Sequence, residues 1–230
     1  MALPKKYEAI DEWKTLMFLY DSALREISTK IEILNNEFLH VHNYNPIEHV
    51  KSRIKSAESI VKKLKRDGHE ATVDNMVKYL NDIAGIRIIC SFTSDIYKIA
   101  DMISNQSDVK VLMIKNYIAN PKPNGYKSYH MVVSIPIFLS DGPVDTKVEI
   151  QIRTIAMDFW ASLEHKIYYK FEGKAPSYIS EELKECADMV NMLDERMLSL
   201  NEAIKALEEK AKEEREAEEK RAAEQEENID

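Results

Sequence analysis

Both ends of the chain repeat an apolar residue every three or four positions, the pattern of a helix with a narrow apolar stripe. Such a stripe predicts one long helix over residues 6–39 and another near the C-terminus. The first stripe comprises Ile10, Trp13, Met17, Tyr20, Leu24, Ile27, Ile31, Leu34 and Phe38. The second comprises Leu183, Cys186, Val190, Leu193, Met197, Leu200, Ile204 and Leu207. Acidic residues replace the apolar ones beyond Ala211, so we expect packing to stop there and the helix to fray.

Two matching stripes favour pairing of the terminal helices with each other and with another subunit, as in a homotetramer. Either helix could instead lie on the chain's own sheet. The pattern divides the chain into an N-terminal assembly helix (1–44), a central domain (45–175), and a C-terminal helix with an acidic tail (176–230).

The central domain alternates helical patterns with short apolar runs. A helix is predicted from Asn45-Pro46 to about Asp67, and Gly68 ends it. Further helices are predicted over 73–80, from a Ser94 cap to about 105, and from a Thr154 cap to about 171. Strands are predicted over 86–92, 109–116, 129–138 and 144–153, with a turn at 140–143. This order predicts an α/β (α+β) fold with a mixed sheet of four or five strands flanked by helices.

One apolar strand carries polar residues along one face. Glu149, Gln151 and Arg153 alternate with apolar residues, so all three emerge on the same side. They could form the wetted face of a half-exposed strand. Asp82 precedes another apolar run, and it could be a cap or turn residue. Together, however, Asp82 and Glu149 could hold magnesium, which prefers carboxylates combined with substrate phosphates.

Cationic and aromatic residues gather in two other segments. On the predicted helix 46–67, Lys55, Ser59, Lys62 and Arg66 recur at helical spacing; this stripe suits a triphosphate or is a solvated face. Arg87 lies on an apolar strand, and its planar guanidinium suits stacking on a base. The loop 120–130 would present Tyr126 for stacking, or be an ordinary surface loop.

Composition limits the class of protein. The 230 residues, 44% of them hydrophobic, suffice for one substantial core. The net charge of -8 argues against a surface that binds nucleic acid throughout, and the tail from Lys205 supplies -5 of it (six basic, eleven acidic). No apolar run reaches 18 residues and no signal peptide is evident, so we expect no membrane span and a cytoplasmic protein. Cys90 and Cys186 are both predicted to be buried, reduced and inert.

Five segments, in family order over roughly residues 45–171, resemble the synthetase domain of the RelA/SpoT homologue family. The resemblance is closest to the stand-alone small alarmone synthetases of the RelP-like branch, which have a nucleotidyltransferase-like fold. The segments are Arg53-Ile54-Lys55, Asp82-Ile83-Ala84-Gly85-Ile86-Arg87, Asn124-Gly125-Tyr126-Lys127-Ser128-Tyr129-His130, Val148-Glu149-Ile150-Gln151-Ile152-Arg153-Thr154 and Phe159-Trp160-Ala161-Ser162-Leu163-Glu164-His165.

The resemblance implies Mg²⁺-dependent transfer of the β,γ-pyrophosphate of ATP to the 3′-hydroxyl of GDP or GTP, giving ppGpp or pppGpp and AMP. By the same resemblance, Asp82 and Glu149 hold the metal and Glu149 accepts the hydroxyl proton. The implied ATP-binding residues are Arg53, Lys55, Ser59, Lys63, Arg66 and Arg87. Those implied for the acceptor nucleotide are Tyr126, which stacks on guanine, together with Lys122, Lys127, His130, Gln151, Glu164 and His165.

The chain departs from the family in two respects. Lys127 stands where many relatives have arginine, and none of the six histidines is followed by aspartate. A His-Asp pair marks the hydrolase domain of long family members, so we expect no alarmone hydrolysis. Two other functions stay open: a catalytically silent module that binds nucleotides or single-stranded RNA, and a nucleotidyl transferase that releases pyrophosphate. RNA is not otherwise indicated.

Overall fold

The computed structural model describes residues 12–170 and 176–227. Its centre is a mixed five-stranded sheet in the order β1-β2-β5-β4-β3, which confirms the predicted fold class. The strands are β1 (Ile47–Ile54), β2 (Ala84–Cys90), β3 (Lys110–Asn116), β4 (Tyr129–Leu139) and β5 (Gly142–Thr154). Only β2 and β5 pair in parallel, and their register sets Gly85 opposite Glu149. The long β4–β5 hairpin turns at the predicted position.

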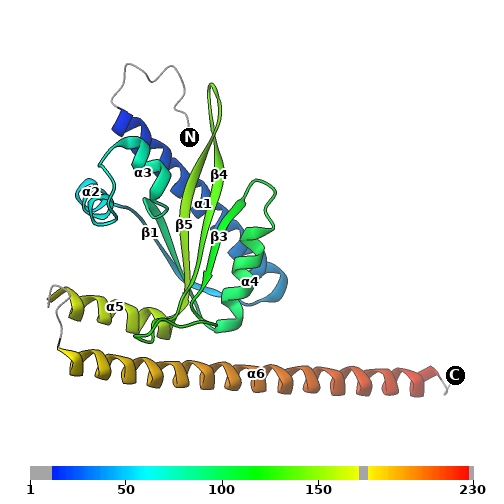
Figure 1. Cartoon of the computed structure of the whole chain (residues 1–230). Helices are drawn as coiled ribbons and strands as arrows, with labels where there is room; N and C mark the ends of the chain where they lie inside the picture. The colour runs from blue at the N-terminus through cyan, green and yellow to red at the C-terminus, as the bar shows by residue number, and fades with distance from the viewer. Residues whose placement is uncertain (1–11, 171–175, 228–230) are drawn as a thin grey trace.

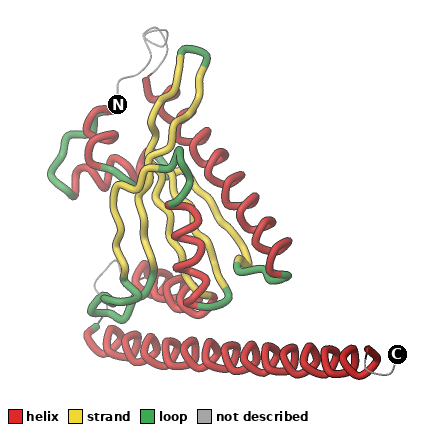
Figure 2. Tube along the Cα trace, turned by 90° about the vertical axis from the view of Figure 1, so that its right-hand side faces the viewer, coloured by secondary structure: helices red, strands yellow, loops and turns green. Residues whose placement is uncertain are grey.

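Helices cover the two faces of the sheet unequally. The apolar face packs against α1 (Glu12–His42) and α4 (Thr93–Ser104), and this core includes Leu19, Ile27 and Ile150. The other helices are α2 (Ala57–Arg66), α3 (Val73–Tyr79), α5 (Ile155–Lys170) and α6 (Ser177–Glu227). Figures 1 and 2 show α1 lying along the sheet and α6 crossing one end of the molecule. The opposite face of the sheet carries the polar residues of β5, and α5 packs over part of it.

The predicted helix over 46–67 is wrong in its first half. Residues 47–54 form β1, an edge strand that pairs antiparallel with β2. Asn45 does not cap a helix, because its side-chain oxygen accepts a hydrogen bond from Ile47 N, two residues on. The apolar residues of this segment also fit a helical spacing, but pairing with β2 decides its conformation. The helix begins at Ala57, and Ser56 caps it by accepting from Ser59 N at 3.3 Å.

Some predictions about helix ends and cysteine burial are confirmed and others are wrong. Thr154 caps α5 as predicted, since its hydroxyl accepts from Met157 N at 3.1 Å. Ser94 does not cap α4, whose N-cap position is Phe92 and has no side-chain bond. Helix α6 continues through Glu227, so the expected fraying beyond Ala211 is wrong. The side chains described beyond Ala211 are exposed, as expected where packing stops. Cys90 is buried, whereas Cys186 is exposed, contrary to the prediction.

The terminal helices do not pair along their stripes within the chain. The apolar stripe of α1 is mostly buried against the chain's own sheet, which is the alternative noted above. Helix α6 packs against α5 and α4. Much of the α6 stripe is exposed, including Leu193, Met197 and Leu200. Within residues 12–170 and 176–227, none of the helices is long and apolar enough to cross a bilayer.

Candidate active site

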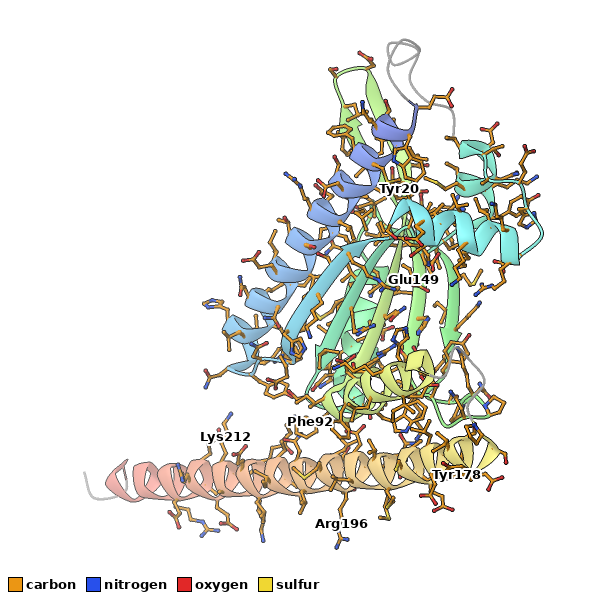
Figure 3. The ribbon with its side chains drawn as sticks, turned by 90° about the vertical axis from the view of Figure 1, so that its left-hand side faces the viewer. Tyr20, Phe92, Glu149, Tyr178, Arg196 and Lys212 are labelled. Atoms are coloured by element: carbon orange, nitrogen blue, oxygen red, sulfur yellow. The ribbon has the colours of Figure 1, made fainter. Side chains whose placement is uncertain are left out.

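A cavity of about 270 Å³ opens on the polar face of the sheet and contains both predicted carboxylates. Asp82 reaches it from the turn before β2, and Glu149 reaches it from β5. Figure 3 shows Glu149 near the middle of the sheet, below α2. The parallel pairing of β2 with β5 brings the two acids together although 67 residues separate them (149 minus 82). The cavity is lined by Lys51, Ser52, Arg53, Asp82, Gly85, Ile86, Arg87, Glu149 and Gln151.

Asp82 lies between two ammonium groups. Lys55 Nζ is 2.6 Å from Oδ2, and Lys63 Nζ is 2.8 Å from Oδ1. Burial favours the neutral acid, but the hydrogen bonds and charges of Lys55 and Lys63 outweigh it, so the pKa of Asp82 lies below its ordinary value. The carboxylate is therefore ionised at neutral pH.

Glu149 is held by polar side chains instead of lysines. Gln151 Nε2 donates to Oε2 at 3.1 Å, and His130 Nδ1 lies 3.6 Å from Oε1. Burial raises the pKa of Glu149 and nearby Asp82 adds to this, but His130 and Gln151 outweigh both and lower it overall. Glu149 is thus an anion at neutral pH, able to accept a proton.

The predicted ATP-binding residues between 53 and 66 lie on β1, on α2 and in the segment between them rather than on one helix. Arg53 is exposed on β1 and lines the cavity. Lys55 follows β1, and Lys63 lies on the inward side of α2 beside Asp82. Ser59 and Arg66 are exposed on α2, and there Arg66 pairs with Asp67 at 2.9 Å.

Arg87 projects from β2 into the same cavity. Its Nη1 donates to Asp158 Oδ1 at 3.2 Å, while its buried Nε has no hydrogen-bond partner. Burial, followed by the nearby charge of Arg153, lowers the pKa of Arg87. The unsatisfied Nε leaves Arg87 with hydrogen-bonding capacity for a ligand.

The predicted acceptor residue Tyr126 belongs to an aromatic cluster beside Glu149. Its hydroxyl lies 2.8 Å from His130 Nε2 and accepts from Arg153 Nη2 at 2.7 Å. When that hydroxyl donates to Nε2, the remaining proton of a neutral His130 is on Nδ1, facing Glu149. Tyr117 packs edge-on against both rings, at centroid distances of 5.9 and 5.2 Å. A continuous polar chain therefore joins Arg153 to Glu149.

The other predicted acceptor residues lie at different distances from this cluster. Lys122 Nζ is 4.8 Å from the centre of the Tyr126 ring. Lys127 points to α6, where its Nζ is 3.6 Å from Glu195. Glu164 accepts from Asn124 Nδ2 at 3.2 Å, so it holds the loop 120–130 against α5. His165 is exposed on α5, outside the cavity lining.

Three residues of the site were missed or left without a role by the sequence analysis. Arg153 was placed on the polar face but given no function, although it is buried and has four side-chain partners. Tyr117 and Asp158 carried no pattern that distinguishes them from ordinary loop and helix residues. Only their contacts with Tyr126, Arg87 and Arg153 identify them.

The two carboxylates suit a magnesium ion that also binds water and substrate phosphates, rather than a metal held by protein ligands alone. Within the described ranges there is no group of three or more His, Cys, Asp or Glu side chains placed to hold a metal. Asp82 Oδ1 is buried and faces Lys63 Nζ at 2.8 Å, an ion pair that a divalent cation would replace. Magnesium commonly takes one or two carboxylates and completes its shell with water and substrate phosphates. Asp82 and Glu149 match that requirement.

Two carboxylates beside lysines in one cavity suit a metal ion and substrate phosphates, the groups that phosphoryl-type transfer must position and neutralise. Residues 52–174 match the family described as "Region found in RelA / SpoT proteins". The chain is 48% identical to GTP pyrophosphokinase YwaC of Bacillus subtilis over 195 residues, covering 85% of this chain and 93% of that one. It is 35% identical to GTP pyrophosphokinase YjbM of the same organism, covering 81% and 87%. The chain belongs to the RelA/SpoT family.

Solved structures of small alarmone synthetases share the fold. Small alarmone synthetase 2 of Bacillus subtilis superposes with a TM-score of 0.77 at 46% identity, covering 84% of this chain and all of that one. Small alarmone synthetase 1 of the same organism, bound to its product pppGpp, gives 0.78 at 33% identity, covering 84% and 97%. The same enzyme bound to AMPCPP gives 0.72 at 31% identity, covering 84% and 98%.

Proposed function

We propose that this protein is a GTP pyrophosphokinase, a small alarmone synthetase that transfers the β,γ-pyrophosphate of ATP to the 3′-hydroxyl of GDP or GTP. The observation that carries the proposal is the convergence of Asp82 and Glu149 in one cavity, between cationic side chains and an aromatic cluster. The pyrophosphokinase relatives and their nucleotide-bound structures support it.

On the donor side, Arg53 and Arg87 would hold adenine between their guanidinium planes. Both line the cavity, and planar guanidinium groups stack well on aromatic faces. Lys55 and Lys63 would turn from Asp82 to the phosphates, with Ser59 and Arg66 on α2 completing that side. Such transfer asks the protein chiefly to position the groups and neutralise their charge.

On the acceptor side, guanine would stack on Tyr126 while Lys122 and Lys127 approach the acceptor's phosphates. The 3′-hydroxyl oxygen forms a bond to the β-phosphorus of ATP, and the bond from that phosphorus to the AMP oxygen breaks. Glu149 takes the hydroxyl proton, because it is ionised and lies beside His130 and Tyr126. AMP leaves with the electron pair of the broken bond.

Magnesium would be held by Asp82 and Glu149 together with the phosphates, and it would neutralise charge that develops on the transferring group. The ionised carboxylate of Asp82 supports this assignment, because it lies beside Lys55 and Lys63, cations whose place a metal ion would take.

The assembly we propose is a homotetramer formed through α6. The exposed side chains on that helix include Met192, Leu193, Met197, Leu200 and Ile204. Helix α1 contributes less than its sequence pattern predicted, because most of its apolar stripe is already buried on the sheet. Because its substrates are ATP and guanine nucleotides, we expect the enzyme to act in the cytoplasm.

Incubation with GDP and γ-labelled ATP tests the proposal. Label in a guanosine product, with release of AMP, is the expected result. Label released as free pyrophosphate would instead identify a nucleotidyl transferase. Nucleotide binding without turnover would identify a silent binding module.

A further inference from the structure

One carboxylate on α5 joins two arginines that come from different strands. Asp158 Oδ1 accepts from Arg87 Nη1 at 3.2 Å and from Arg153 Nη1 at 2.9 Å. Arg87 is on β2 and Arg153 on β5, and both project to the polar face. The Asp158 side chain is 14% exposed and that of Arg153 is 5% exposed, so water does little to screen this pair, whereas Arg87 is 32% exposed.

Arg153 connects this carboxylate to the acceptor side. Its Nη2 donates to the Tyr126 hydroxyl at 2.7 Å, and its Nε donates to Ser128 Oγ at 3.3 Å. The guanidinium carbon also lies 5.1 Å from the centre of the Tyr126 ring. A base that stacks on Tyr126 would therefore touch or displace a side chain that is bound to Asp158.

Arg87 connects the same carboxylate to the donor side. It lines the cavity with Arg53 and Asp82, and it keeps a buried Nε without a partner. Two guanidiniums that share one acceptor oxygen cannot move independently, because the departure of either changes the field and geometry felt by the other. Among the hydrogen bonds of the described residues, Asp158 is the acceptor that Arg87 and Arg153 share.

Attachment of α5 to the molecule does not depend on Asp158. The helix is capped by Thr154. Trp160 Nε1 donates to the carbonyl of Leu183 at 2.9 Å, which ties α5 to α6. Asp158 is therefore not needed to attach α5, and its contacts with the two arginines indicate a role in the nucleotide sites.

We propose that Asp158 is a positioning residue that couples the donor and acceptor nucleotide sites, by holding Arg87 and Arg153 on a single oxygen. The inference rests on the proposed function for the identity of the two nucleotides. Binding of the acceptor nucleotide rearranges Tyr126 and Arg153, and Asp158 transmits the change to Arg87. Each nucleotide therefore alters the affinity of the other, and by linkage the factor is the same in both directions.

Binding of AMPCPP, a non-hydrolysable ATP analogue, measures this coupling by calorimetry with Mg²⁺, in the absence and presence of saturating GDP. For the wild type we expect the two dissociation constants to differ by about 5- to 150-fold. In Asp158→Asn the carboxylate charge is lost, and we expect the ratio to fall to within about twofold of unity, with each nucleotide alone still binding. A role confined to folding would lower both affinities and leave the ratio unchanged.

Arg153→Lys provides a second variant if Asp158→Asn does not fold, as judged by circular dichroism. Lysine keeps the charge but lacks the planar fork whose Nη1 and Nη2 bond Asp158 and Tyr126 separately, so the ratio should fall here as well. Asp145→Asn is the matched control, because Asp145 is an exposed acid on β5 far from the cluster, and its ratio should equal that of the wild type.

A wild-type ratio near unity, or variants that keep the wild-type ratio, would overturn the inference. The measurement needs no turnover, so it is separate from the test of the proposed function. A wild type that makes no alarmone argues against that function, whereas a wild type that makes it without coupling argues against Asp158 alone.

Discussion

The two sides of the cavity hold their side chains differently. On the donor side, Lys55 and Lys63 are paired with Asp82 itself, and Arg53 is exposed. On the acceptor side, Tyr126, His130 and Arg153 are joined by hydrogen bonds into a chain that ends at Glu149. The donor side must exchange ion pairs when a metal and phosphates arrive. The acceptor side is held by its own hydrogen bonds, which a base stacked on Tyr126 would shift.

This difference follows from the elements that carry the residues. The donor side is built at an edge strand and on α2, a short helix whose cationic face meets solvent. The acceptor side is built on the central strands β4 and β5 and is covered by α5 and the loop 120–130. A ligand on the acceptor side meets hydrogen-bonded side chains and aromatic rings, whereas one on the donor side meets ion pairs. We therefore expect acceptor-side substitutions to change chiefly the affinity for the acceptor nucleotide, and donor-side substitutions to change chiefly the neutralisation of metal and phosphate charge.

The largest effect is expected where the two sides meet, at Glu149. Glu149→Gln keeps the size and polarity of the side chain but cannot accept the hydroxyl proton. Turnover should fall by at least the ~10²–10⁴-fold that general-base catalysis contributes. AMPCPP affinity, measured by calorimetry, should stay near that of the wild type. Normal turnover in this variant would disprove the assignment of the base.

Removal of the donor-side carboxylate should come next. Asp82→Asn removes the partner of Lys55 and Lys63 and a proposed metal ligand. The rate should therefore fall, and the Mg²⁺ concentration that gives half the maximal rate should rise, each by about 10–100-fold or more. Initial rates titrated with Mg²⁺ would show the change. Asp74→Asn, an exposed acid on α3 outside the cavity, is the matched control. Equal Mg²⁺ curves for both variants would refute a metal-binding Asp82.

On the acceptor side, two substitutions at Tyr126 separate stacking from hydrogen bonding. Tyr126→Ala removes the ring, and loss of base stacking of ~1–3 kcal/mol should raise the KM for GDP by about 5–150-fold. Tyr126→Phe keeps the ring but loses the bonds to Arg153 and His130, so a smaller, several-fold increase is expected. The KM for ATP should change less in both. A larger change for ATP than for GDP would reverse the assignment of the two sides.

The packing of the acceptor loop on α6 should have a smaller effect, on stability. Gly125 has φ +85°, and a Cβ there would lie 2.4 Å from Ala187 Cβ. Gly68 has φ +79° with nothing within 4 Å, so it provides the backbone control. Both Ala variants should lose about 1–2 kcal/mol through the left-handed backbone. Gly125→Ala should lose more free energy of unfolding in urea because of the clash with Ala187. Equal losses in the two variants would mean that the loop moves away from α6 at no cost.

The smallest effect should be a pH dependence of stability that both carboxylates share. Their native pKa values lie below the ordinary values of about 3.9 for Asp and 4.3 for Glu. Ionisation therefore stabilises the fold fully above those values, and the contribution disappears as the pH falls through the lower native ones. Urea unfolding without metal should show the wild type losing its advantage over Asp82→Asn below about pH 4. A stability difference between the wild type and Asp82→Asn that grew as the pH fell would contradict the lowered pKa values of the two carboxylates.

The sequence pattern predicted some elements well because local signals were sufficient for them. Alternation along residues 144–153 identified β5 and the shared face of Glu149, Gln151 and Arg153. The same reasoning failed at residues 47–54, where spaced apolar residues fit a helix. The pairing of that segment with β2 is a contact with residues 30 to 43 positions away, and no local pattern encodes it.

The site divides in the same way. The residue types at 82, 126 and 149 and the family-like segments around them indicated the chemistry. Tyr117 and Asp158 became recognisable only through their neighbours: the ring of Tyr126 for one and two arginines for the other. A polar residue on a helix can face solvent or a buried partner, and helical spacing does not distinguish the two.

The amino-acid sequence by itself determined which residues share the polar face of β5, because side chains alternate along any strand. It also determined that the C-terminal helix carries an apolar stripe followed by an acidic tail. Only the tertiary structure decided that Asp82 and Glu149 line one cavity, that α1 packs on the sheet, and that Asp158 bonds both arginines. Those outcomes depend on strand order and helix packing, which are set by burial of the whole core and not by any one segment.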